Sequence, residues 1–205
     1  MINKLYIKII SIIVELVDYS NKKKIINFFK KYFIHKEIIA IDIGAHNGET
    51  IDLFYKNFNI KKILAFEPNI KLYNLLIKKK KYDNERITLL NHGVGVTEEK
   101  RELNILIDSA SSTFNTINLD SDYYKKKNKI VTFLSGKKEL FEKKQQISIV
   151  SLSKIILENK IEKIDILKID TEGFELNVLK GIRNHDFKKI KFIYFEHHYD
   201  LMINK

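Results

Sequence analysis

Residues 38–50 read IIAIDIGAHNGET, an apolar run that reaches Asp42 and is followed by two glycines four positions apart. Because the chain has only 7 glycines in 205 residues, the placement of Gly44 and Gly48 is informative. The β-branched run predicts a strand buried on both faces, and residues 47–57 predict a helix after it. A glycine directly after a strand allows a tight turn, and one at the helix start removes a side chain where a ligand approaches closely.

The same alternation of short apolar strands and helical segments continues along the chain. Five runs are predicted strands, at 38–43, 61–67, 86–91, 164–170 and 190–196. Helical periodicity lies between them, at 47–57, 70–80 and 174–179. Such alternation is typical of parallel strands joined by right-handed crossovers. The predicted fold class is therefore α/β, with a Rossmann-like, doubly wound and mostly parallel sheet.

The N-terminal part of the chain has a different pattern from the rest. Residues 1–36 carry apolar positions at helical spacing and predict an extension of two amphipathic helices, which leaves 37–205 as the main domain. Lys8 and Glu15 interrupt the apolar stretch, so it fits neither a signal peptide nor a membrane span, which needs about 20 apolar residues. We expect these helices to pack on the main domain or on a twin subunit in a homo-oligomer. Peripheral contact with a membrane through their lysines is the alternative.

Residues 97–160 interrupt the alternation and predict a β-rich insertion over the carboxyl edge of the sheet. Within it, residues 100–108 and 129–134 alternate like exposed antiparallel strands. Residues 109–113, SASST, are interpreted as a polar turn, and residues 122–129, DYYKKKNK, as a charged aromatic loop.

The composition narrows the function classes. The net charge of +11 arises from 37 basic and 26 acidic residues, but 34 of the basic residues are lysines spread over the whole chain. Proteins that bind phosphate groups usually do so through bidentate hydrogen bonds from arginine. We therefore attribute the positive charge to a lysine-rich composition of the whole chain, and we expect no nucleic-acid partner. The absence of cysteine excludes disulfides, thiolate metal sites and cysteine nucleophiles, and it is compatible with a cytoplasmic location, with membrane association as the alternative.

Polar residues and glycines gather where the predicted strands end. In open α/β sheets, ligands bind outside the carboxyl ends of the strands. The residues in question are Asp42–Gly48, Glu67, Asn91–Gly95, Asp170, Glu172, Gly173, Glu196, His197 and His198. The strand interiors stay apolar, so a binding site is predicted at this edge of the sheet.

The spacing between the glycine turn and Glu67 predicts the kind of cofactor. His46 stands where a dinucleotide fingerprint has its second glycine, so no pyrophosphate is expected. Glu67 ends the second strand 23 residues after Gly44, where an acid commonly accepts hydrogen bonds from both hydroxyls of a ribose. A nucleoside without phosphates, whose amino-acid part meets Asp42 and a helix N-terminus, describes S-adenosyl-methionine.

Several segments together resemble the FkbM-type methyltransferases, a branch of the class I S-adenosyl-methionine-dependent enzymes that O-methylate sugars and other secondary hydroxyls. The segments are DIGAHNGET (42–50), FEPN (66–69), NHGVG (91–95), LKIDTEGFELNVLKGI (167–182) and YFEHH (194–198). They occur in the family's order, and LKIDTEGFE is the most specific of them. The chain departs from the family at His46, where asparagine is frequent. A further departure is its end at Lys205, where class I enzymes usually add an antiparallel pair of strands.

The resemblance implies a role for each matching position. The methionine part of the cofactor would lie against Asp42, Gly44, Ala45, His46 and Gly48. Glu67 would hold the ribose, while Pro68, Gly93 and Val94 would flank the adenine. Asp170 and Glu172 would face the transferred methyl group.

Methyl transfer to a hydroxyl needs collinear reactants and a base near the methyl group. The predicted catalytic residues are Asp170, His198, Glu172 and Glu196, with Asp170 and His198 ranked first. Two alternatives stay open, because these groups and His197 could hold Mg²⁺ or Mn²⁺, and Glu172 could simply begin a helix. The remaining candidates, His35, His92 and His185, are interpreted as surface or loop residues.

The sequence thus predicts an S-adenosyl-methionine-dependent O-methyltransferase that acts on a small-molecule or glycan acceptor. A nicotinamide-dependent Rossmann oxidoreductase is the alternative enzyme, although the third fingerprint glycine is missing. A third reading is a non-catalytic basic module for anionic glycan, membrane or RNA, whose affinity would fall steeply with salt.

Overall fold

The computed structural model describes residues 21–107, 111–136 and 138–195. The predicted helix at the start of the chain lies outside these residues, and so do the predicted site residues Glu196, His197 and His198. Among the described residues, no helix is long and apolar enough to cross a membrane.

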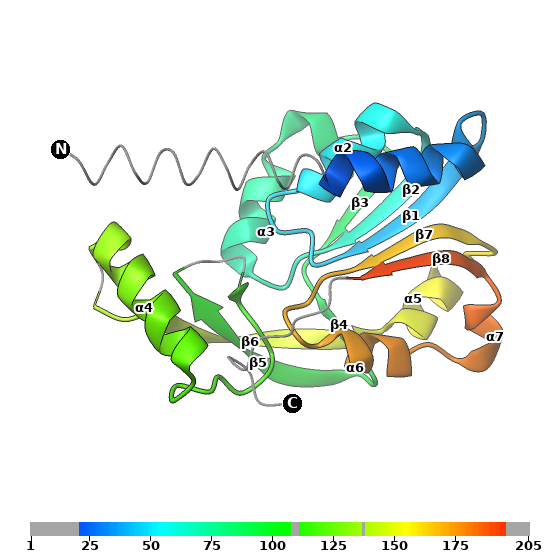
Figure 1. Cartoon of the computed structure of the whole chain (residues 1–205). Coiled ribbons are helices and arrows are strands. Elements are labelled where there is room, and N and C mark those ends of the chain that lie inside the picture. The colour runs from blue at the N-terminus through cyan, green and yellow to red at the C-terminus, as the bar shows by residue number, and fades with distance from the viewer. Residues whose placement is uncertain (1–20, 108–110, 137, 196–205) are drawn as a thin grey trace.

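A five-stranded sheet in the order β3-β2-β1-β7-β8 forms the centre of the fold (Figure 1). Its strands are β1 Glu37–Ile43, β2 Asn59–Phe66, β3 Ile87–Leu90, β7 Ile164–Ile169 and β8 Ile190–Phe195. Every pairing in this sheet is parallel. The five strands predicted from the sequence and the α/β fold class are therefore confirmed.

Helices cover both faces of this sheet, as a doubly wound fold requires. Alternate residues of β1 separate the two cores: Ile38 and Ala40 face a cluster with α2, whereas Ile41 and Ile43 face a cluster with α5. The helices of the domain are α2 Glu49–Asn57, α3 Ile70–Ile77, α5 Leu152–Glu158, α6 Glu175–Lys180 and α7 Asn184–Phe187, with a 3₁₀ turn at Lys80–Tyr82.

Residues 21–33 are helical and pack on the same sheet face as α2. Phe29 and Phe33 are buried, and their ring centroids lie 5.7 and 5.8 Å from that of Phe192 in β8. This part of the N-terminal extension therefore packs on the main domain, as expected from its apolar spacing.

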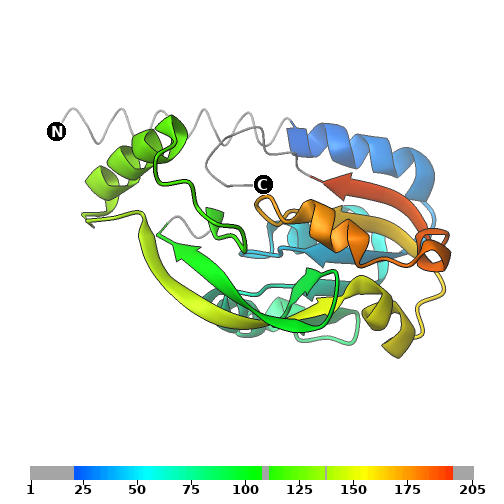
Figure 2. The same cartoon turned by 90° about the horizontal axis from the view of Figure 1, so that it is seen from below.

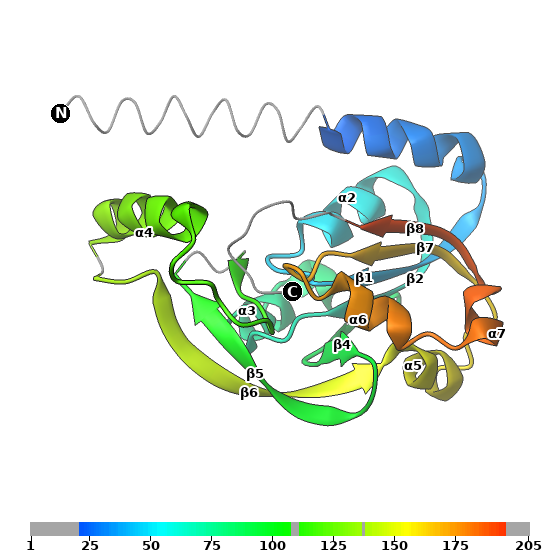
Figure 3. The same ribbon diagram turned by 60° about the horizontal axis from the view of Figure 1, so that its bottom comes forward.

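A second sheet has the order β4-β6-β5. Its strands β5 Glu99–Leu106 and β6 Phe141–Ser151 belong to the insertion, and β4 Gly93–Gly95 immediately precedes it. Strands β5 and β6 pair antiparallel, and β4 pairs with β6 in parallel. Figures 2 and 3 show this hairpin running beyond the ends of the main strands toward α4, Asp122–Ser135.

The prediction for residues 122–134 was wrong, because both the expected loop and the expected second strand belong to α4. The hydroxyl of Ser121 accepts a hydrogen bond from the Tyr124 N–H and begins the helix, and Gly136 ends it with a φ of 69°. Tyr124 then packs with Leu106 and Leu140. This tertiary contact favours a helix, although the β-branched residues in 129–134 locally favour a strand. The strand that pairs with β5 is residues 141–151 instead.

Candidate active site

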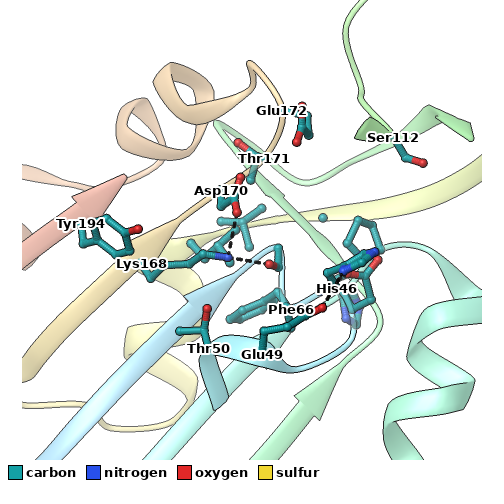
Figure 4. A pocket seen from close by; sticks show the side chains of 18 of the residues that line it. His46, Glu49, Thr50, Phe66, Ser112, Lys168, Asp170, Thr171, Glu172 and Tyr194 are labelled. Atoms are coloured by element: carbon teal, nitrogen blue, oxygen red, sulfur yellow. Dashed lines mark hydrogen bonds and ion pairs between the residues drawn. The ribbon is translucent and has the colours of Figure 1, made fainter. Parts of the chain in front are cut away.

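A cavity of about 330 Å³ lies at the carboxyl ends of the strands, where the sequence predicted a site. Its wall includes residues from the ends of β1 and β2, from β4, and from β7 and β8 (Figure 4). The insertion contributes Leu103, Ser112 and Phe114. The first described helix contributes Asn21, Lys22 and Ile25. The sequence did not indicate this contribution, because the pattern of a helix that precedes β1 does not show whether the helix reaches the cavity.

Most of the predicted site residues meet in this wall. They are Gly44, Ala45, His46, Glu67, Pro68, Gly93, Val94, Asp170 and Glu172. Asp42 and Gly48 do not line the cavity, and Glu196 and His198 lie outside the described residues.

Gly44 makes the turn that directs the chain from β1 into the cavity wall. Its φ of 85° is a conformation that favours glycine, and its N–H donates to the Phe66 carbonyl at 3.0 Å. A Cβ on Gly44 would overlap the carbonyl oxygen of Asp170. The glycine is therefore required by the backbone of the neighbouring strand end.

Gly48 packs closely against a residue of the fold. A Cβ at this position would meet the hydroxyl of Tyr82, not the cavity, and the φ of Gly48 is 85°. The Tyr82 hydroxyl donates to the Gly48 carbonyl at 3.0 Å and is 2.8 Å from a carboxylate oxygen of Asp52. Gly48 thus serves the packing of Tyr82 against the start of α2.

Glu67 is buried at the end of β2 and is directed at the glycine turn. One carboxylate oxygen accepts the His46 N–H at 2.7 Å, and the other accepts the Asn69 N–H at 2.8 Å. Burial raises the pKa of Glu67 to about 7, although these two hydrogen bonds act in the opposite direction. A carboxylate has about four acceptor positions, so each oxygen can accept one further hydrogen bond from a ligand.

His46 carries the turn with a φ of 48°, in the left-handed region. Asparagine, aspartate and histidine enter this region more readily than other residues with a side chain. Histidine is therefore compatible with the backbone conformation of this position. Its Nδ1 also lies 3.2 Å from a carboxylate oxygen of Glu49, which shares the cavity wall.

Lys168 is a buried lysine in β7 that the sequence interpretation missed. Its Nζ lies 2.7 Å from the Gly44 carbonyl oxygen and 3.1 Å from Asp42 Oδ1. It also lies 3.3 Å from Asp170 Oδ2 (Figure 4). Burial alone would lower the pKa of Lys168, but the two carboxylates outweigh it and raise this pKa to about 12. A charged residue within the apolar run IDILKID was the signal that could have indicated it.

Asp42 is fully buried behind the cavity wall and forms an ion pair with Lys168. Burial raises the pKa of Asp42, while Lys168 acts in the opposite direction. The predicted direct contact between Asp42 and the cofactor therefore has no support in this geometry. Asp42 instead acts through Lys168, which holds both the glycine turn and Asp170.

The segment after β7 is a strained turn with positive φ values of 52° at Glu172 and 93° at Gly173. Glu175 holds it from within, since its Oε1 accepts hydrogen bonds from the Thr171 and Gly173 N–H groups at 2.9 and 3.1 Å. Thr113 holds it from the insertion by donating its hydroxyl to the Glu172 carbonyl at 2.7 Å. Because α6 begins at Glu175, Glu172 lies in the turn before the helix, facing the cavity.

Comparison of the amino-acid sequence with known protein families identifies the family of this chain. The family model described as the methyltransferase FkbM domain matches residues 42–202. The chain belongs to the FkbM methyltransferase family. A crystal structure of methyltransferase FkbM from Methylobacillus flagellatus KT is similar to it, with 18% sequence identity and a TM-score of 0.43. The match covers 71% of this chain and 28% of that one, so the chain spans less than a third of the solved protein. No curated protein sequence matches it.

The histidines of this FkbM-family chain lie partly where they were not expected. His92 was interpreted as a surface or loop residue, but it lines the cavity beside Gly93. His35 and His185 are exposed, as predicted. Within the described ranges, no group of three or more histidine or acidic side chains is placed to hold a metal ion.

Proposed function

We propose that this FkbM-family methyltransferase transfers the methyl group of S-adenosyl-methionine to a hydroxyl of a saccharide, a glycoconjugate or a related secondary metabolite. The observation that supports the proposal most is the shared cavity, in which Glu67 and the Gly44 turn meet Asp170 and Glu172. One part of this wall suits a nucleoside, and the other part carries carboxylates suited to an acceptor hydroxyl.

The residues present fit the cofactor. The free acceptor positions of Glu67 suit the two ribose hydroxyls, which are hydrogen-bond donors. Gly93, Val94 and Pro68 give an apolar wall for a flat base, and the side chains of Phe114 and Ile149 pack directly against Gly93. The bound cofactor would supply an electrophilic methyl group on a sulfonium.

The protein then needs to orient an acceptor hydroxyl and take up its proton. Asp170 is suited to orientation, because Lys168 fixes one of its oxygens while its side chain keeps 31% of its surface exposed. Figure 4 shows Asp170, Thr171 and Glu172 in succession along the same side of the cavity. We assign hydroxyl binding to Asp170 and proton uptake to Glu172 or His198.

The proposal is tested by incubating the protein with methyl-labelled S-adenosyl-methionine and a panel of hydroxylated glycans and sugar derivatives. We expect labelled O-methyl product with at least one acceptor, and a loss of about 100-fold or more in Asp170→Asn. Glu162→Gln, at an exposed acid outside the cavity, is the matched control and should retain the activity. Label on nitrogen, or equal rates for both variants and the wild type, would contradict the proposal.

A further inference from the structure

Helix α4 has two chemically different faces, and its inner face is fully used by the fold. Tyr124 is 7% exposed and packs with Leu106 and Leu140. The side-chain oxygen of Asn128 accepts the Leu140 N–H at 2.7 Å. Val131 packs against the same cluster. These contacts fix the rotation of the helix about its axis, so the residues on its opposite side are directed away from the protein.

The outer face of α4 presents large apolar side chains among lysines. Tyr123, Ile130 and Phe133 are 46%, 59% and 71% exposed, and their spacing of seven and three places them on one side of the helix. Phe133 has the largest exposed fraction among the large apolar side chains that the structure describes. Lys126 and Lys129 are also exposed, and they alternate with these apolar residues along the same side.

This mixture of side chains distinguishes between classes of partner. The core of a protein interface is depleted of lysine, whereas here lysines lie between the apolar residues. A nucleic acid would use the lysines but would leave Ile130 and Phe133 in water, and α4 contains no arginine. A helix that lies in the surface of an anionic bilayer needs both kinds of group, since its apolar side chains enter the acyl boundary and its lysines reach the headgroups.

We propose that the outer face of α4, defined as Tyr123, Lys126, Lys129, Ile130 and Phe133, docks on an anionic phospholipid bilayer. The sequence analysis left membrane contact through the N-terminal helices as an alternative, and the first of these helices lies outside the described residues. The present proposal rests on α4 alone. The opposite charges of lysines and anionic headgroups make the bilayer the complementary occupant of this face.

The position of α4 gives this docking a consequence for the active site. The carboxyl ends of the main strands point toward the side of the molecule on which α4 lies (Figures 1 and 3). Lys127 of α4 is hydrogen-bonded to Ser111, whose neighbour Ser112 lines the cavity. A docked α4 would thus bring the cavity near acceptors carried by the bilayer. Only this consequence rests on the proposed function, because the docking itself does not require methyl transfer.

The test is sedimentation of the full chain with vesicles of phosphatidylcholine alone or mixed with phosphatidylglycerol. We expect binding to the anionic vesicles only, weakening as salt rises. The double variant Ile130→Ser, Phe133→Ser should lower the vesicle affinity about tenfold or more. The matched control is Leu157→Ser, Leu176→Ser, which removes two similarly exposed leucines elsewhere (68% and 61%) and should bind like the wild type.

The charge contribution is tested separately with Lys126→Glu, Lys129→Glu, which we expect to reduce binding to anionic vesicles about tenfold or more. Lys61→Glu, Lys188→Glu, at exposed lysines away from α4, controls for the change in net charge. Thermal melting by circular dichroism confirms that each variant is folded.

Three results would overturn the docking proposal. The wild type could fail to bind anionic vesicles, or both α4 variants could bind like their controls, which would move any membrane contact to another part of the chain. Light scattering could instead show a dimer that Ile130→Ser, Phe133→Ser dissociates, which would make the face an interface between copies. Methyl transfer to a water-soluble acceptor, measured in parallel, reports on the proposed function independently of all three.

Discussion

The ammonium group of Lys168 donates a hydrogen bond to the carbonyl oxygen of Gly44 at 2.7 Å, across 124 positions of sequence. This contact joins the end of β7 to the turn after β1, and both segments line the cavity. The same nitrogen pairs with Asp42 and Asp170, so one buried cation fixes the turn and a carboxylate proposed to bind the acceptor.

Replacing Lys168 with methionine should both destabilise the fold and weaken cofactor binding. The substitution leaves Asp42 buried without its ion-pair partner, a change that typically costs about 3–5 kcal/mol. Urea unfolding measures the stability, and Lys188→Met at an exposed site serves as control. Adding Asp42→Asn to Lys168→Met should recover part of the loss, since the unpaired charge is then gone. No recovery in the double variant would show that the pairing with Asp42 is not what Lys168 contributes.

Gly44→Ala should be far more harmful than an alanine at another glycine of positive φ. Both Gly44 and Gly136 have positive φ, so the strained backbone of an alanine at either position should lower the free energy of unfolding by about 1 kcal/mol. Of these two glycines, Gly136 has open space for a Cβ, whereas a Cβ on Gly44 would overlap a backbone atom, the carbonyl oxygen of Asp170. We expect a loss of several kcal/mol for Gly44→Ala against about 1 kcal/mol for Gly136→Ala. Similar melting temperatures for the two variants would contradict the close approach of these strand ends.

Thr113→Val should lower the methyl-transfer rate more than cofactor affinity. The hydroxyl of Thr113 is buried and holds the Glu172 carbonyl, so its loss removes the support of the turn from the insertion. The expected loss of stability is about 1–3 kcal/mol. Thr97→Val, at an exposed threonine, controls for the change of side chain. If the turn is held without Thr113, both variants will have the same rate and the same binding isotherm.

Glu67 should make stability depend on pH in a direction unusual for a carboxylate. Its pKa is about 7 in the folded protein, above the ordinary value of 4.5, so the folded state binds more protons between these pH values. The free energy of unfolding should therefore fall as pH rises from about 4.5 to 7 and then level off, by up to about 3 kcal/mol. In Glu67→Gln this decrease in the free energy of unfolding between about pH 4.5 and 7 should be absent, because glutamine does not titrate. Parallel pH profiles of urea unfolding for the two proteins would argue against the raised pKa.

The same proton should oppose cofactor binding, because a protonated Glu67 has fewer acceptor positions for ribose hydroxyls. We expect the Kd for S-adenosyl-homocysteine to rise by up to about tenfold per pH unit below pH 7. Binding to Glu67→Gln should be weak at every pH. A Kd that is constant from pH 5.5 to 8 in the wild type would separate Glu67 from the ligand.

The main sheet could be predicted from the sequence because each strand is a compact apolar run with a clear end. The β1 run is buried on both faces, so its pattern does not depend on any distant partner. The clustering of polar residues at strand ends followed from the parallel topology, and the shared cavity of Gly44, Glu67 and Asp170 agrees with it.

Other features depend on contacts between distant residues, and local patterns do not reveal these. Residues 122–134 became helical through the Ser121 cap and the packing of Tyr124 on Leu140. Gly48 resembled a ligand contact, but the residue that excludes a side chain there is Tyr82, which lies 34 positions later. Lys168 was overlooked because two of its partners, Asp42 and Gly44, come from the β1 segment more than 120 positions earlier.

The most direct test of the account is calorimetric titration of S-adenosyl-homocysteine into the wild type and into Glu67→Ala at pH 8. We expect binding at one site per chain in the wild type and a loss of about 100-fold or more in the variant, because the two ribose hydroxyls lose a charged acceptor. Melting curves confirm that the variant is folded. The absence of binding to the wild type, or an unchanged Kd in Glu67→Ala, would contradict the claim that the turn and this acid form an adenosyl site.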